Sequence, residues 1–343
     1  MGPYQVSAER TRFSSPSHRS LRQRNGMVKI VMSSASLAHS ALLPDSIQVF
    51  QRGWLSSNNV LIRGSRQTVL IDSGYCTHAA QTQALVAHAL DGRPLDLLIN
   101  THLHSDHCGG NAALQAAYPD LKTHIPPGHA HFVAAWNPDA LTYGPTGQSC
   151  PQFRFDAKLE PGTEFQLGNA LWEIHAAPGH DTHSVMLFEP VERILVSADA
   201  LWERGFGVVF PELDGEGAFD EVASTLDIIE SLQPTTVIPG HGAPFRDVAT
   251  ALTVARQRLD GFVRNPAKHM QYAAKVLLKF KLLEVQQLEL QALVHWAQST
   301  PYFASTFARH FSGVALAEAV EQLVRELVRS GAATMQGSAV HNV

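Results

Sequence analysis

The sequence predicts an α+β fold: an αββα sandwich of two face-to-face β-sheets between outer helices, followed by a small helical domain. Short apolar strands form a β-meander and then a β-α-β arrangement, the order expected when helices cover two packed sheets. After Asn265-Pro266 the composition changes and three helical patterns follow one another. We therefore expect a disordered tail at 1–40, a main domain at 41–264 and a helical domain at 265–343.

Apolar runs and turn residues predict the elements of the main domain. The strands expected in the first sheet are 47–50, 59–62, 68–71 and 95–100, with helices at 77–90 and 111–117. The strands expected in the second sheet are 165–167, 171–176, 185–188 and 194–196, followed by helices at 219–232 and 248–264.

Two further regions have a less regular pattern. Residues 125–155 are rich in proline and predict a long loop whose aromatic side chains pack it, with a substrate wall as the alternative. Residues 200–211 carry three aromatic side chains and are expected to cap a site. The C-terminal domain is expected to hold helices at 270–280, 284–297 and 314–330 and a β-hairpin at 331–340.

Composition is typical of a soluble globular protein, with 45% hydrophobic and 17% charged residues among 343. No run approaches the ~18 apolar residues needed to span a membrane. The first 40 residues are rich in Ser, Arg and His and lack the apolar core of a secretory signal. Three cysteines are too few for a disulfide framework, so we expect a reducing, cytoplasmic environment.

Charge is unevenly distributed along the chain. Residues 1–29 have a net charge of +5 and residues 264–343 of +3, while residues 30–263 carry twelve basic against twenty-five acidic side chains, a net charge of −13. Such an acidic domain is a poor match for a polyanionic substrate. We therefore expect a small-molecule substrate rather than nucleic acid, and no membrane partner.

The stretch Thr101–Gly110 contains the densest group of chemically active side chains. His102 and His104 lie two apart, so they point the same way from extended backbone. Asp106 and His107 follow where Gly109-Gly110 allows a tight turn. Imidazole and carboxylate donors suit Zn²⁺ first, with iron or manganese as alternatives. A polar loop that holds several histidines by chance is the simpler explanation, because the chain contains 18 histidines.

Similar residues recur downstream at the ends of three further apolar runs, which weakens the chance explanation. They are His180, Asp199 and His241. Strand-end loops on a rigid scaffold are where binding sites are usually built. Five histidines and two aspartates exceed the needs of one tetrahedral metal but suit two adjacent divalent ions.

This set of motifs resembles the metallo-β-lactamase-fold hydrolases, particularly their glyoxalase II-like branch, over residues 47–245. The resemblance implies a first metal held by His102, His104 and His180. It implies a second metal held by Asp106, His107 and His241, and a bridge between the two metals formed by Asp199. It also implies that the C-terminal tail is winged-helix-like, as in some members.

The family resemblance also bears on Asp72 and on antibiotic hydrolysis. An aspartate at the position of Asp72 orients a metal ligand in the family, although an Asx-turn is equally consistent with the sequence. True zinc β-lactamases lack a bridging aspartate, so Asp199 argues against antibiotic hydrolysis as the main activity.

We therefore predict a binuclear metal-dependent hydrolase in which a metal-bridging hydroxide attacks the carbonyl carbon of a thioester, ester or lactone. Asp106 is the predicted catalytic residue, because it would anchor the second metal and orient the nucleophile. A homodimer is one option for the assembly.

Three other functions stay open at this point. One is a mononuclear iron persulfide dioxygenase. Another is a metal-dependent nuclease or phosphodiesterase that uses a basic cluster formed by Lys268, Lys275, Lys279 and Lys281. The third is a metal-binding scaffold without catalysis.

Overall fold

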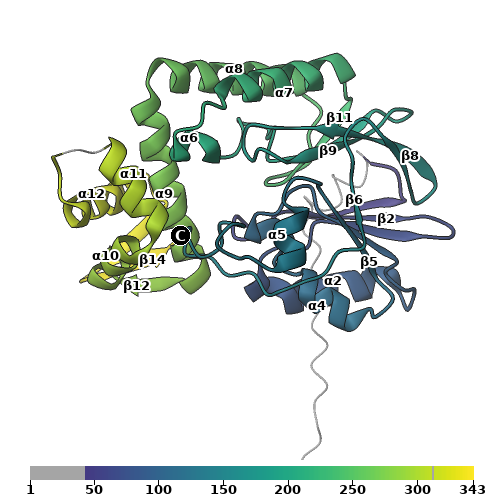
Figure 1. Ribbon diagram of the computed structural model, residues 1–343, viewed down its shortest axis with the longest axis horizontal. Coiled ribbons are helices and arrows are strands. Elements are labelled where there is room, and N and C mark those ends of the chain that lie inside the picture. The colour runs from purple at the N-terminus through teal and green to yellow at the C-terminus, as the bar shows by residue number, and fades with distance from the viewer. Residues whose placement is uncertain (1–42, 311–312) are drawn as a thin grey trace, which may run out of the picture.

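The computed structural model describes residues 43–310 and 313–343, arranged as a two-sheet body with a helical region at one end (Figure 1). The tail expected to be disordered, 1–40, lies outside the described residues. None of the helices in the described ranges combines the length and apolarity needed to cross a bilayer.

The first sheet has six strands in the order β1-β2-β3-β4-β5-β6. They are β1 (Ile47–Phe50), β2 (Asn59–Arg63), β3 (Thr68–Ile71), β4 (Leu97–Ile99), β5 (Lys122–Ile125) and β6 (Ala157–Lys158). The first three form the antiparallel meander expected from the sequence, and β3 to β6 run parallel. Its helices are η1 (Cys76–His78), α2 (Ala79–Leu90), α3 (Ser105–Cys108), α4 (Asn111–Ala117) and α5 (Ala130–Ala135).

The second sheet has the order β11-β10-β9-β8-β7. Its strands are β7 (Glu164–Leu167), β8 (Ala170–Ala176), β9 (Val185–Glu189), β10 (Ile194–Ala198) and β11 (Thr236–Pro239). All neighbouring pairs are antiparallel except β10 and β11. The helices that follow are α6 (Phe210–Asp214), α7 (Phe219–Leu232) and α8 (Val248–Arg264).

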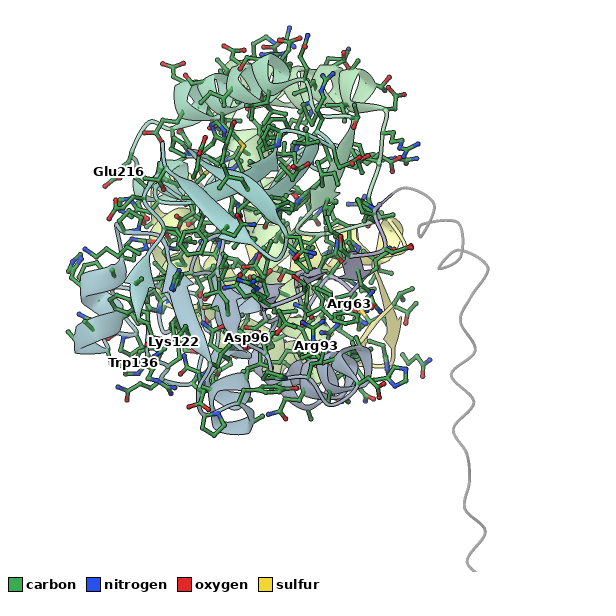
Figure 2. The ribbon with its side chains drawn as sticks, turned by 90° about the vertical axis from the view of Figure 1, so that its right-hand side faces the viewer. Arg63, Arg93, Asp96, Lys122, Trp136 and Glu216 are labelled. Atoms are coloured by element: carbon green, nitrogen blue, oxygen red, sulfur yellow. The ribbon has the colours of Figure 1, made fainter. Side chains whose placement is uncertain are left out.

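The two sheets face one another, and helices cover their outer sides, with α7 and α8 on one and α2 and α4 on the other (Figure 1). Successive side chains along β2 point to opposite faces of the first sheet. Val60 and Ile62 join the core between the sheets, whereas Leu61 packs under α2 and α4. Side chains fill the space between the sheets (Figure 2). Each buried Val, Ile or Leu stabilises the fold by roughly 1.5–3 kcal/mol. The αββα sandwich predicted from the sequence is confirmed.

The loop predicted for 125–155 is wrong in part, because α5 lies within it. Trp136 follows this helix and packs against the rings of Tyr143 and Phe153, at the outer side of the body (Figure 2). These three side chains belong to one small apolar cluster, in agreement with the packing role expected of them.

Within its described residues, the C-terminal region contains four helices and a three-stranded sheet of order β12-β14-β13. Its elements are α9 (Pro266–Val285), β12 (Gln287–Glu289), α10 (Leu290–Ser299), α11 (Pro301–His310), α12 (Leu316–Arg329), β13 (Ala333–Gln336) and β14 (Ala339–Asn342). The helix predicted at 284–297 starts too early. Gln286 has a positive φ of 65° and ends α9, and β12 then pairs with β14 before α10 begins. Helix α11 was not predicted, whereas the hairpin is observed as β13 and β14.

Three of the four lysines in the basic cluster bind groups within the C-terminal region. Lys279 donates to the carbonyl of Ala332 and to Asn342 Oδ1, both at 2.6 Å. Lys275 pairs with Glu326, and Lys281 pairs with Glu284. Lys275 and Lys279 therefore connect α9 to α12 and to the residues around β14, whereas Lys281 pairs within α9 itself.

Candidate metal centre

The seven predicted ligand residues meet at one edge of the sandwich, where strands of both sheets end. The first sheet supplies His102 and His104 from the loop after β4, and Asp106 and His107 from α3. The second sheet supplies the rest from the loops after three of its strands. These are His180 after β8, Asp199 after β10 and His241 after β11.

The first group consists of three histidines. His104 Nδ1 lies 3.1 Å from His102 Nε2 and 2.8 Å from His180 Nε2, so three ring nitrogens converge on one point. The other nitrogen of two rings is held by a neighbour. His180 Nδ1 donates to the carbonyl of Val208 at 2.5 Å, and His102 Nδ1 lies 3.2 Å from Thr101 Oγ1. These contacts aim the free nitrogens at the centre of the group.

The second group combines two carboxylates with two histidines, Asp106, His107, Asp199 and His241. His241 Nε2 lies 3.1 Å from Asp106 Oδ2, and His107 Nε2 lies 3.6 Å from Asp199 Oδ1. Asp199 Oδ2 is also 3.4 Å from His180 Nε2, so this carboxylate touches both groups. Its position matches the bridging role implied by the family resemblance.

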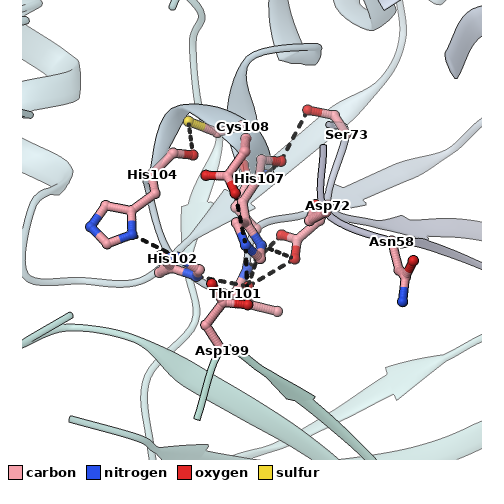
Figure 3. Close-up of polar contacts among 12 residues, drawn as sticks. Asn58, Asp72, Ser73, Thr101, His102, His104, His107, Cys108 and Asp199 are labelled. Atoms are coloured by element: carbon pink, nitrogen blue, oxygen red, sulfur yellow. Dashed lines mark hydrogen bonds and ion pairs between the residues drawn. The ribbon is translucent and has the colours of Figure 1, made fainter. Parts of the chain in front are cut away.

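Asp72 orients His107, as the family resemblance implied. Its Oδ2 accepts a hydrogen bond from His107 Nδ1 at 2.7 Å, and Thr101 donates to both carboxylate oxygens (Figure 3). These partners lie far along the chain from Asp72, so the Asx-turn interpretation is wrong. The contact leaves His107 Nε2 facing the other members of the second group.

The charge balance of the site favours a bound cation. Burial lowers the pKa of His102 well below its ordinary value and that of His104 to about 4, so both rings are neutral, as metal ligation requires. Burial also lowers the pKa of His107, but the carboxylates of Asp72, Asp199 and Asp106 outweigh it and hold this pKa well above its usual range. The second group therefore attracts positive charge.

Two observations test whether these residues fit divalent metals. The ligand atoms of each group lie within 4.8 Å of one another. His107 Nε2 is buried and has no hydrogen-bond partner among the described residues, an uncommon state for a polar atom inside a protein. A cation between the members of the second group would satisfy that atom, so the donor set fits the metals that the sequence predicts.

Two glycines make room for the ligands. A Cβ atom on Gly240 would lie 2.2 Å from Asp199 Oδ1, and one on Gly207 would lie 2.3 Å from His180 Nδ1. Both positions therefore exclude a side chain for reasons of space. Gly240 directly precedes the predicted ligand His241, but the sequence contains no signal for Gly207, whose contact depends on the path of the cap.

Two tryptophans complete the wall of the second group. Trp202 Nε1 donates to Asp199 Oδ1 at 3.2 Å, in agreement with the capping role predicted for 200–211. Trp54 stacks on His241, with ring centroids 5.3 Å apart, and yet its side chain is 56% exposed. Trp54 was missed by the sequence analysis, because a lone aromatic residue in a loop carries no signal for such a contact.

Other candidate side chains lie outside the two groups. Cys108 is buried, with its Sγ 3.2 Å from Tyr143 Oη and 3.8 Å from Cys150 Sγ, so it packs inside the protein and is not a member of either ligand group. His129 packs edge-on against His183 with ring centroids 4.5 Å apart, and neither belongs to a ligand group.

A cleft of about 680 Å³, including the part open to solvent, lies over the metal centre. Ligand side chains from both groups line it, among them His104, Asp106 and Asp199. The remaining walls come from the loop at 142–148, from the cap at 202–210 and from α9.

An αββα sandwich with two adjacent His/Asp groups on its strand-end loops defines a metal-binding protein of the metallo-hydrolase type. The sequence model of the Metallo-beta-lactamase superfamily matches residues 52–241, more than half of the chain, and the chain belongs to this superfamily. The resemblance stated from the motifs is thus confirmed.

The chain is similar to several named relatives. It is 28% identical over 232 residues to a hydroxyacylglutathione hydrolase of Xanthomonas euvesicatoria pv. vesicatoria, covering 65% of this chain and 75% of the relative. It is 25% identical over 225 residues to an acyl-coenzyme A thioesterase of Gallus gallus, and the match covers 60% of this chain and 80% of the relative. A Brucella anthropi hydroxyacylglutathione hydrolase is 25% identical over 197 residues, 56% of this chain and 64% of the relative.

Solved structures support the fold. A metallo-beta-lactamase family protein from Thermus thermophilus superposes with a TM-score of 0.51 at 19% identity, covering 88% of this chain and all of that one. A subclass B3 metallo-beta-lactamase of Bradyrhizobium japonicum gives a TM-score of 0.51 at 19% identity, covering 66% and 93%. At this identity the likeness concerns the fold alone.

Proposed function

We propose that the protein is a binuclear metal-dependent hydrolase that cleaves a thioester, ester or lactone of a small-molecule substrate. The observation that carries this proposal is the pair of adjacent ligand groups that share Asp199. The relatives named hydroxyacylglutathione hydrolase and acyl-coenzyme A thioesterase support it, because both names describe cleavage of a thioester. Zinc is the preferred metal of the proposal, with iron or manganese as alternatives.

When bound, two divalent ions supply an activated water and a positive field for the charge that develops on the carbonyl oxygen. The residues of the chain prepare this site in separate ways. The neutral rings of His102 and His104 present their nitrogens without a proton to displace. Asp72 and Trp202 hold His107 and Asp199 in fixed orientations by hydrogen bonds.

Asp106 is the residue to which we assign a direct catalytic role. Its carboxylate contacts His241 at 3.1 Å, keeps 14% of its side-chain surface exposed and lines the cleft. From that wall it can accept a hydrogen bond from the attacking water and orient it toward a bound carbonyl. The chemistry needs no serine or cysteine nucleophile.

The decisive experiment is metal analysis by elemental mass spectrometry on protein purified without added metal. We expect about two zinc or manganese ions per chain. His104→Ala and Asp199→Asn should lose metal and abolish thioester hydrolysis, while circular dichroism shows an intact fold. His131→Ala is the matched control, because this histidine is exposed and belongs to neither ligand group.

The same measurement separates the alternatives. About one iron per chain, together with oxygen consumption on a persulfide, would replace the hydrolase proposal with a dioxygenase. The second ligand group would then have no metal to bind, which is why the structure favours the binuclear hydrolase.

A further inference from the structure

We propose that the cleft binds an apolar acyl group against α9, so that the substrate is a thioester or ester of a hydrophobic carboxylic acid. The inference rests on the proposed hydrolase function and adds the substrate class.

The walls of the cleft beyond the ligand residues are largely apolar. Helix α9 presents four side chains to it, Tyr272, Val276, Leu277 and Phe280, and the cap presents three, Trp202, Val208 and Phe210. A surface of this kind releases water when it contacts hydrocarbon, and the resulting free energy grows with the area buried.

The charged side chains in the cleft point to the same substrate class. Among the described residues that line it, the acidic side chains are Asp106 and Asp199, both candidate metal ligands, and there is no Lys or Arg. An acyl group that carries a carboxylate or phosphate would therefore lose its hydration without gaining an ionic partner. A neutral, apolar acyl group meets no such penalty.

Phe210 connects the acyl site to the metal centre. Its ring lies 4.8 Å from the ring of His104 and 6.0 Å from that of Tyr302 on α11, so it spans the gap between the first ligand group and the C-terminal helices. A carbonyl placed at the metal centre would therefore direct its acyl chain past Phe210 and along α9.

The α9 wall is fixed to the main domain. Tyr75 donates a hydrogen bond to Glu284 Oε1 at 2.9 Å and accepts one from the backbone of Ser149 at 3.1 Å. The Tyr75 ring also packs edge-on against Phe280, with centroids 5.1 Å apart. A wall held in this way can discriminate between acyl groups by size.

The test is hydrolysis of acetyl, butyryl, hexanoyl and octanoyl thioesters of N-acetylcysteamine by the zinc-loaded full chain. We expect kcat/KM to rise about fourfold per methylene over the first members of the series, as ~0.8 kcal/mol per methylene implies. Val276→Trp, which fills the cleft, should lower kcat/KM for the hexanoyl thioester at least tenfold, and by a larger factor than it lowers kcat/KM for the acetyl thioester.

Two further variants keep the test informative. Val263→Trp makes the same substitution at a side chain of α8 that is 54% exposed, and should leave the series unchanged. Phe280→Ala enlarges the cleft and should move the preferred chain length upward, which answers the question even if Val276→Trp does not fold.

Binding provides a readout that is independent of turnover. The amide analogue of the hexanoyl thioester should bind the wild type measurably in calorimetry and bind Val276→Trp at least tenfold more weakly. A chain-length series that is flat in both kcat/KM and binding, and insensitive to both cleft variants, would overturn the acyl-site inference and leave the hydrolase intact. Absence of turnover for every thioester, and for ester and lactone substrates as well, with two metals bound would overturn the proposed function, while analogue binding would still decide the acyl site.

Discussion

Asp72 shows how one side chain can set the geometry of a candidate metal ligand. Its carboxylate accepts a hydrogen bond from His107 Nδ1 at 2.7 Å and two hydrogen bonds from Thr101. The backbone of Asp72 has a φ of 58°. Aspartate and asparagine tolerate this left-handed conformation better than other side chains that have a Cβ atom. The negative charge of Asp72 therefore orients His107, and the tolerance of aspartate for a positive φ suits the local backbone.

Replacing Asp72 by Asn should weaken metal binding by the second group about 10- to 100-fold, because the negative charge that orients His107 is lost. The backbone should be retained, since Asn adopts the same φ. The measurement is competition with a chromophoric chelator. Asp91→Asn is the matched control, as Asp91 also has a positive φ of 48° and is exposed at the end of α2. Unchanged affinity in Asp72→Asn would contradict the orienting role.

At the residue scale the sequence predicted all seven side chains that the structure brings together, because each follows an apolar run in a recognisable turn. It did not predict Trp54 or Gly207. Their contacts with His241 and His180 join segments more than 25 residues apart that carry no shared pattern. Such contacts depend on the assembled fold and are invisible in local sequence.

The loops that follow the strands are the elements on which the centre depends. Between β11 and His241, Gly240 passes directly beneath the second group, where a Cβ atom would lie 2.2 Å from Asp199 Oδ1 and 3.0 Å from His107 Cε1. The φ of Gly240 is outside the left-handed region, so space alone demands glycine here.

Gly240→Ala should displace Asp199 and lower the metal content from about two ions per chain toward one. The measurement is elemental mass spectrometry after dialysis, with circular dichroism to monitor the fold. Gly53→Ala is the control, because an added Cβ there meets nothing within 4 Å. Full metal content in Gly240→Ala would show that the loop accommodates the methyl group by moving.

The elements that the sequence analysis missed share a physical reason. Strand β12 is three residues long and exists because β14 pairs with it from more than fifty residues away. Helix α5 has six residues and lies among prolines that favour a loop. The strands β1 to β4 and β7 to β10 were predicted, because their buried faces impose continuous or alternating apolar runs. Strands β5 and β6, at one end of the first sheet, were not predicted.

The whole molecule is held together in part by the site itself. Ligand residues come from loops of both sheets, and Asp199 of the second sheet contacts His107 of the first. The folded chain holds these loops together and the unfolded chain does not, so a metal would bind the folded chain more tightly. Metal binding would therefore stabilise the sandwich.

Removing the metals with a chelator should lower the melting temperature by several degrees. The lost stabilisation is about 2.7 kcal/mol for each site that was held at a hundredfold excess over its Kd. Differential scanning calorimetry before chelation, after chelation and after zinc is restored provides the check. A melting temperature that does not change despite proven metal loss would mean that the loops are held by protein contacts alone.

The position of α9 has a consequence for how such proteins diversify. The candidate metal ligands lie before residue 242, whereas four side chains of the wall that we propose to contact the acyl group come from residues 272–280. Mutations in that one helix can therefore alter which molecules are accepted while the reaction itself is inherited unchanged. The proposed catalytic residues and the proposed substrate-selecting residues are encoded in different parts of the gene. Selection can therefore change substrate preference without changing the residues of the metal centre.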